Sequence, residues 1–342
     1  MARRRRDWTH YDDESLLDER LCDLDLTLEG TPLERRVQRL YAELDRRGIG
    51  FRPHAWLSSE WFSPDGVPGV AIPFFLAHPR LMKLELRQML EVEGGSSTAC
   101  MRLLRHETGH AIDTAYRLHR RKRWRDVFGL YSQPYPRIYR PRPSSRAFVL
   151  HLDAWYAQAH PAEDFAETFA VWLTPRLNWR KQYADWPKAL AKLQFVDELM
   201  KEEVLGKPAP VRSKAHLEPV SKLRMTLKNY YRSKRSRYGL AWPDVYDRDL
   251  KRLFSDDPRH ARRPPASTFL RRLRPKIRGI IAEYTNSNVY TVDQVLQDMI
   301  ERCRVLKLRL TMVPSRTETQ AIVLVTVHTM SCLHARRFEI PV

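Results

Sequence analysis

The chain has 342 residues, 43% of them hydrophobic, and a formal net charge of +19 from 60 Lys and Arg against 41 Asp and Glu. Two ordinary domains fit this length, and the hydrophobic content is sufficient for a sizeable core, which excludes wholesale disorder. No apolar run approaches the roughly 18 residues of a spanning helix, and no signal-peptide core follows the arginine-rich start, so we expect a soluble chain outside the general secretory route.

The first predicted helix begins at a capping box, Thr31-Pro-Leu-Glu34, with proline at the first helical position, and Gly48 ends it. A strand-like stretch follows at residues 51–57. Residues 66–76 are strongly apolar but contain two prolines, which cannot donate to a sheet ladder. This pattern is typical of an edge strand.

A long helix is predicted over residues 98–123, after a turn with a capping serine. Residues 131–145 contain four prolines and three tyrosines and are expected to form a loop that could cover a site. A short strand at residues 149–154 leads to a helix that opens at His160-Pro161, with proline again in the first turn. A helix over residues 187–204 completes the first unit.

Beyond residue 204 the chain changes in character. Residues 205–265 mix proline, basic residues and single aromatics without a clean period, which indicates a basic linker or wrap. Two helices, at 267–284 and 291–306, and strand-like runs at 307–313 and 321–328 are predicted to follow. We therefore expect a domain at 1–204, the linker, and a small α+β domain at 266–342.

The charge is distributed unevenly along the chain. Residues 1–200 hold 31 basic and 27 acidic residues, whereas residues 201–342 hold 29 and 14. The surplus in the second segment is compatible with nucleic acid, an anionic membrane surface or an acidic protein as partner, or simply with a solvated arginine-rich surface.

The cysteines lie far apart and form no Cys-x-x-Cys pair, which argues against a disulfide scaffold or a cysteine zinc site. They are Cys22, Cys100, Cys303 and Cys332. A reducing, bacterial-type cytoplasm suits them best.

The strongest motif is His106-Glu-Thr-Gly-His110, an H-E-x-x-H sequence inside a predicted helix. Residues four apart project from one helix face, so the two imidazoles can hold one Zn²⁺ at about 2.0–2.1 Å each. Glu107 follows the first histidine, where a general base that activates a water is expected.

A catalytic zinc needs a third protein ligand, and Glu163 is the candidate. Glu163 and Glu167 share one face of the helix that follows His160, and two like charges there repel each other unless a metal and its histidine compensate. The alternative is that these acids simply complement the helix dipole.

These residues, with Asp113 and Tyr156, resemble the gluzincin metallopeptidases, most closely the bacterial family of putative zinc-binding metallopeptidases and more distantly the catalytic domain of anthrax lethal factor. The resemblance covers roughly residues 50–200. It implies a zincin-like α+β fold, with an active-site helix pair and a small sheet. It also implies zinc ligation by His106, His110 and Glu163, with Glu107 as general base, a hydrogen bond from Glu167 to a liganding imidazole, and a metal-facing Tyr156.

Two of these residues have ordinary alternatives. Asp113 lies on the metal-facing side of its helix and could brace the site, but an ion pair with Arg117, four residues on, is equally compatible with the sequence. Tyr156 follows a tryptophan and could belong to the core.

The sequence therefore predicts a zinc metallopeptidase with one zinc per chain, in which Glu107 activates water and Tyr156 stabilises the oxyanion. The segment 66–76 could hold an extended peptide substrate as an added strand, and the loop 131–145 could form a lid.

The competing hypothesis is a non-hydrolytic zinc-containing binding module whose basic C-terminal region contacts nucleic acid or an acidic partner, although no recognised nucleic-acid motif accompanies it. The basic residues that suggest it are Arg262, Arg263, Arg271, Arg272, Arg274, Lys276 and Arg278, with Tyr230, Tyr231 and Tyr238 upstream.

Overall fold

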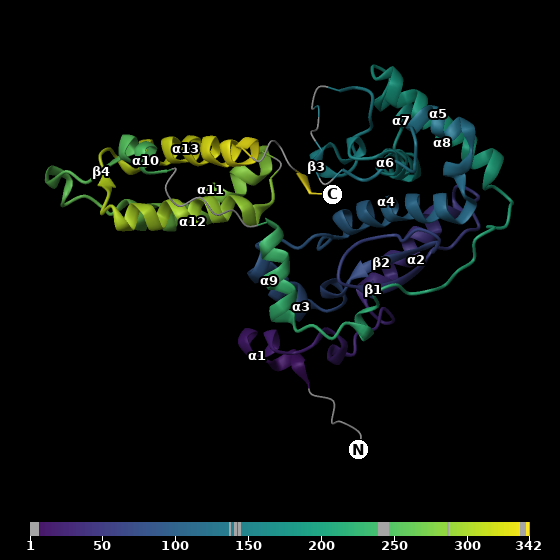
Figure 1. Ribbon diagram of the computed structural model, residues 1–342, viewed down its shortest axis with the longest axis horizontal. Coiled ribbons are helices and arrows are strands. Elements are labelled where there is room, and N and C mark those ends of the chain that lie inside the picture. Colours follow the sequence, from purple (N-terminus) through teal and green to yellow (C-terminus); the bar gives the residue numbers. More distant parts are fainter. Residues whose placement is uncertain are drawn as a thin grey trace. The chain divides into compact units, whose positions relative to one another are not determined.

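A computed structural model describes residues 7–136, 138–139, 142, 145–238, 246–285, 287–335 and 340–341 (Figure 1). The protein is mostly helical with small sheets, so the predicted α+β class is confirmed. The chain forms two compact units, one of residues 1–88, 92–230 and 340–342, the other of residues 89–91 and 231–339. The domain limits expected at 204 and 265 stay a prediction. No helix in the described ranges is long and apolar enough to cross a membrane.

The first unit surrounds one long helix, α4 (Ser97–Tyr116), which packs against α2, α6 and β2. Its other helices are α1 (Asp13–Leu17), α2 (Pro32–Asp45), α3 (Pro79–Met89), α5 (Lys122–Phe128), α6 (Pro161–Leu173), α7 (Trp179–Gln182) and α8 (Pro187–Glu203). The predicted helix at 98–123 is thus divided, because Arg117 adopts a left-handed conformation (φ 54°) that ends α4.

Helix α2 begins as the sequence predicts. The Thr31 hydroxyl accepts a hydrogen bond from the Glu34 backbone N–H (3.4 Å), and proline occupies the first turn. Its apolar face is buried at Leu33, Val37, Leu40 and Leu44.

One two-stranded sheet of the first unit consists of β1 (His54–Ser58) and β2 (Gly69–Pro73), which pair in parallel. The apolar segment 66–76 supplies β2, all of whose residues are buried. On its other side, the Ala71 N–H bonds the Phe62 carbonyl (2.8 Å). Strand β2 therefore offers less free edge to a substrate peptide than the sequence suggests.

The strand predicted at 149–154 is wrong. Residues 153–158 form the short 3₁₀ helix η5 (Asp153–Gln158), and side chains take the backbone hydrogen bonds before it. The Leu150 N–H bonds the Tyr183 hydroxyl (3.0 Å), and the Leu152 N–H bonds the Glu167 carboxylate (2.8 Å). Two side chains thus accept the backbone hydrogen bonds that a neighbouring strand would accept in a sheet. Further along, β3 (Ile138–Tyr139) pairs with β6 (Ile340–Pro341).

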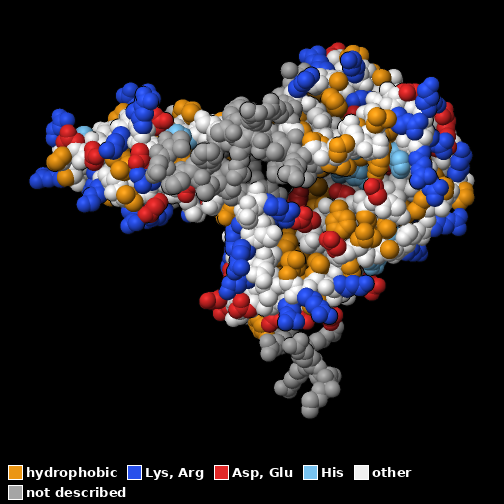
Figure 2. Space-filling view, in the orientation of Figure 1, with side chains coloured by type: hydrophobic (Ala, Val, Ile, Leu, Met, Phe, Trp, Pro, Cys, Tyr) orange, Lys and Arg blue, Asp and Glu red, His pale blue; other side chains and the backbone are white. Residues whose placement is uncertain are grey.

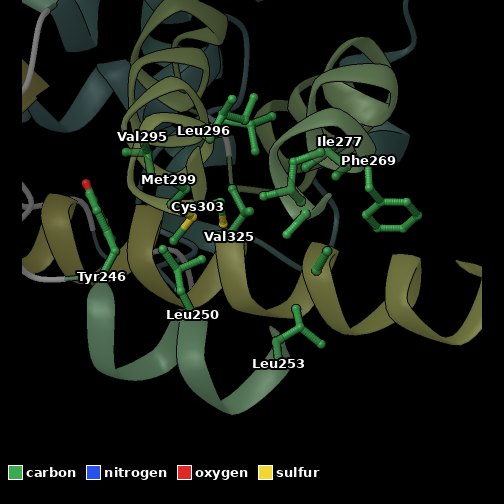
Figure 3. Close-up of a cluster of buried hydrophobic side chains, with 14 of the residues drawn as sticks. Tyr246, Leu250, Leu253, Phe269, Ile277, Val295, Leu296, Met299, Cys303 and Val325 are labelled. Carbon is green, nitrogen blue, oxygen red and sulfur yellow. The ribbon is translucent and has the colours of Figure 1, made fainter. Parts of the chain in front are cut away.

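The second unit is a helical assembly around its own apolar core (Figure 3). Side chains of α10, α11, α12 and α13 point toward one another in this core, among them Leu250, Ile277, Met299 and Val325. Its elements are α10 (Asp247–Leu253), β4 (Phe254–Ser255), α11 (Ala266–Thr285), α12 (Val289–Val305), β5 (Arg309–Leu310) and α13 (Pro314–Ala335), and α9 (Leu227–Tyr238) joins the two units in sequence.

The strand predicted at 321–328 is also wrong, since this segment lies inside α13. Its β-branched residues favour a strand, but the buried positions Ala321, Val325, His328 and Thr329 follow helical spacing and pack into the core. Of the strand-like run at 307–313, only β5 is a strand.

Candidate active site

Helix α4 carries the H-E-x-x-H motif in the interior of the first unit. The Ser96 hydroxyl caps the helix by accepting a hydrogen bond from the Ala99 N–H (3.0 Å). His106 is buried and His110 is half-buried on the same face, four residues apart. The helix thus presents both imidazoles side by side.

Helix α6 presents the two carboxylates. Its N-cap is His160, whose Nδ1 accepts a hydrogen bond from the Ala162 N–H (3.1 Å), and Pro161 occupies the first turn. Glu163 and Glu167, one turn apart, are both buried. They face α4, which lies beside α6 (Figure 1).

The two helices approach each other at Gly109. A Cβ atom at this position would lie 2.7 Å from the Ala166 Cα and 3.1 Å from its carbonyl oxygen. Only glycine permits such an approach of two backbones. The glycine inside the motif therefore brings the histidine face of α4 to the carboxylate face of α6.

Three donor atoms converge between these faces. The distances are 3.0 Å from His106 Nε2 to Glu163 Oε2, 3.1 Å from His110 Nε2 to the same oxygen, and 3.2 Å between the two Nε2 atoms. Donors bound to one tetrahedral zinc at about 2.0–2.1 Å lie about 3.3 Å apart. Two imidazole nitrogens and a carboxylate oxygen at this spacing therefore fit zinc, and among the described residues these three form a group that could hold a metal.

Glu163 and Glu167 determine the charge of the first histidine. His106 Nδ1 lies 2.8 Å from Glu167 Oε1, and the other oxygen of Glu167 accepts the Leu152 N–H. Burial opposes protonation of His106, but the hydrogen bonds and charges of the two glutamates outweigh it and raise the pKa of the imidazole. Burial likewise disfavours the Glu163 carboxylate, but the two histidines hold its pKa well below the usual range.

Glu107 follows His106 in α4 and is buried, with 7% of the residue exposed. Burial raises the pKa of its carboxyl group, and the two histidines partly oppose this effect. Within the described ranges its carboxylate has no hydrogen bond or ion pair, so it is available to a small polar molecule at the donor group.

Residues 98–184 match the family model described as "Putative zinc-binding metallo-peptidase". The sequence resemblance to that family is thus confirmed for this segment, which contains the donor group, Glu107 and most of α4. No curated protein and no solved structure matches the chain.

Tyr156 lies beside the donor group. It belongs to η5, and its ring centroid is 5.7 Å from that of His106. Burial and the charges of Glu163 and Glu107 raise the pKa of its phenol, so it stays a protonated hydrogen-bond donor.

Asp113 bonds His119 and not Arg117, the partner that the sequence suggested. Its two oxygens lie 2.8 Å from the backbone nitrogen and from Nδ1 of His119, and burial raises the pKa of its carboxyl group. Arg117 makes no ion pair with it in the described structure. The His119 ring stacks on Tyr131 with centroids 4.1 Å apart. Asp113 thus braces the start of the tyrosine-rich loop.

Tyr135 was not singled out as a site residue from the sequence. Its hydroxyl donates a hydrogen bond to Glu163 Oε1 (2.9 Å), and its ring stacks on His160 with centroids 3.8 Å apart. The only sequence signal was its place in the loop 131–145 that we predicted as a lid, of which residues 137, 140, 141, 143 and 144 lie outside the described residues. The lid itself stays a prediction.

Proposed function

We propose that the protein is a zinc-dependent metallopeptidase that binds one zinc per chain through His106, His110 and Glu163 and cleaves a peptide or protein substrate. The observation that carries this proposal is the convergence of three zinc-type donor atoms at 3.0–3.2 Å from two helices, with a buried glutamate beside them. The family match of the same segment supports it.

A bound zinc supplies a Lewis acid for the scissile carbonyl and a water acidified toward neutral pH. The Glu107 carboxylate would take a proton from the attacking water and pass it to the leaving amine. The Tyr156 hydroxyl donates a hydrogen bond to the oxygen on which negative charge develops. Glu167 fixes the orientation of the His106 ring by accepting from Nδ1, which leaves Nε2 free to face the donor group.

The experiment that tests this proposal is metal analysis combined with a peptide-library assay. Wild type purified with zinc in the medium should contain about one zinc per chain and cleave the library. Glu163→Ala should lose most of its zinc and its cleavage activity, because one of three ligands is removed. Glu198→Ala, a change at an exposed position on α8, serves as the control and should retain both.

Two outcomes would contradict the proposal. Wild type that holds zinc but cleaves no peptide would refute peptidase activity. Full zinc content in Glu163→Ala would refute its assignment as a ligand.

The hydrogen bond from Tyr135 gives a finer prediction. Tyr135→Phe should weaken zinc binding by roughly tenfold, because partners that orient a ligand typically contribute 10- to 100-fold in metal affinity. Tyr131→Phe is the matched control, since its hydroxyl bonds Asp65 instead. Zinc affinity is measured by competition with a chromogenic chelator, and equal affinities of the two variants would show that the Tyr135 hydroxyl does not support the ligand.

The competing binding-module hypothesis receives no such support. Several basic side chains of the second unit are engaged within it. Arg274 and Arg278 both contact Asp293, and Lys276 pairs with Glu318. In Figure 2, both basic and acidic side chains lie on the visible face of this unit. These three basic side chains are therefore paired with nearby acids, while the excess of 15 positive charges in residues 201–342 remains, and nucleic-acid binding stays a prediction.

A further inference from the structure

The first unit contains a cavity of about 920 Å³ that the peptidase mechanism does not use. It lies between α2, α4 and the C-terminal end of α6, and its charged lining consists of Arg39, Glu43, Arg46, Arg47, Arg105 and Arg176. Five guanidinium groups and one carboxylate thus surround one space, a formal excess of four positive charges.

The carboxylate is fully engaged by two of the arginines. Glu43 is buried, and Arg105 grips it in a bidentate ion pair of 2.7 and 2.9 Å. Arg39 approaches the same carboxylate at 3.3 Å. Glu43 therefore holds Arg39 and Arg105 in place at the cavity wall and has little capacity left for the other three.

Arg47 is also fixed in place, and no carboxylate of the described residues forms an ion pair with it. Its guanidinium bonds the Trp172 carbonyl at the end of α6 and lies 4.6 Å above the Trp172 ring. Such a stacked, planar group is preorganised, so that its remaining N–H donors can bind an oxyanion with little loss of entropy.

Arg46 and Arg176 complete the positive wall. Both are exposed, and neither side chain has an ion pair or hydrogen bond within the described ranges. Arg176 adopts a left-handed backbone conformation (φ 62°) that is uncommon for a residue with a side chain. Like charges gathered at one cavity repel one another, and an anion bound between them would relieve this repulsion.

We propose that this cavity binds a small compound that carries two or more adjacent phosphate groups. Planar guanidinium groups bind phosphate oxygens in pairs, and several of them around one space match a multivalent phosphate better than a single carboxylate. The volume lies in the range of small-molecule pockets. Among the described residues, no aromatic side chain lines the cavity, so recognition rests on the phosphates and not on a stacked base.

Calorimetric titration of the full-length chain tests this proposal, with inorganic tripolyphosphate, orthophosphate and ATP as probes. Tripolyphosphate should bind with a stoichiometry near one and more tightly than orthophosphate, and its affinity should fall as salt rises. An affinity of ATP close to that of tripolyphosphate would identify the phosphate chain of a nucleotide as a sufficient ligand. Much weaker binding of ATP would point to a free oligophosphate.

The double variant Arg46→Gln/Arg176→Gln should lower the tripolyphosphate affinity at least tenfold. Both side chains are exposed and unpaired in the described structure, so the variant should fold, which its melting temperature verifies. The double variant Arg120→Gln/Arg125→Gln, at two exposed arginines outside the cavity, is the control for an equal change of net charge, and its affinity should be unchanged. Absence of binding, an equal loss in both variants, or binding of an acidic peptide in place of tripolyphosphate would overturn the proposal. None of these measurements depends on zinc or on peptidase activity.

Discussion

Replacing Glu107 by glutamine is expected to leave zinc bound and to lower kcat for peptide cleavage by about three orders of magnitude. The amide keeps the size of the side chain but cannot accept the proton of the attacking water, and general-base catalysis typically contributes 10²- to 10⁴-fold. Because Glu107 is not one of the three converging donors, the metal should remain. Zinc content and steady-state kinetics on the best library peptide, measured on the same preparation, verify both parts.

The control for this variant is Glu198→Gln, which makes the same chemical change on the surface of α8 and should retain wild-type kcat. Zinc-loaded Glu107→Gln that cleaves at the wild-type rate would rule out Glu107 as the base. Loss of zinc in this variant would instead show that Glu107 helps to hold the metal.

The donor group was predictable because it depends on local periodicity. His106 and His110 share a face once their segment is helical, and the same holds for Glu163 and Glu167. The contact between the two faces depends on residues far apart in the sequence and is not set by local periodicity. A catalytic zinc needs a third protein ligand, however, and this requirement limited the residues that could supply it. The sequence could therefore indicate which side chains converge before the packing was known.

The contacts that support this group were not predictable in the same way. Tyr135 reaches Glu163 across 28 positions, and nothing in the spacing of a proline-rich loop specifies that hydrogen bond. Asp113 pairs with His119 and not with Arg117. Arg117 has a left-handed backbone conformation and ends α4, so it no longer follows Asp113 with the geometry of a continuous helix. Such partners depend on where a helix stops and how a loop returns.

The arginine-lined cavity lies in the segment that sequence counting described as nearly neutral. Its cations come from α2, α4 and the turn after α6, and the first and last of them, Arg39 and Arg176, are 137 positions apart. A count of charges along the chain offsets these arginines with acidic residues that lie elsewhere in the structure. The fold places the arginines around one cavity. Similarly, β-branched residues at 321–328 suggested a strand, and only the tertiary core shows that their buried positions are helical.

Gly109→Ala is expected to destabilise the first unit and to weaken zinc binding, although alanine is the better helix former. Inside an exposed helix this change stabilises by roughly 0.5–1 kcal/mol. At Gly109 the new Cβ would lie 2.7 Å from the Ala166 Cα, so two backbones must move apart, and overpacking of this kind costs about 1–3 kcal/mol. The steric cost should exceed the gain in propensity.

Gly279→Ala in α11 is the matched control, because a Cβ there meets no atom within 4 Å. It should raise the stability of the second unit slightly, by the propensity term alone. Thermal unfolding shows whether each variant gains or loses stability, and chelator competition measures zinc affinity. Separation of α4 from α6 moves Glu163 away from His106 and His110, so Gly109→Ala should lose both stability and zinc affinity. A stabilised Gly109→Ala with wild-type zinc affinity would mean that the close approach of α4 and α6 at Ala166 is not what positions the three donors.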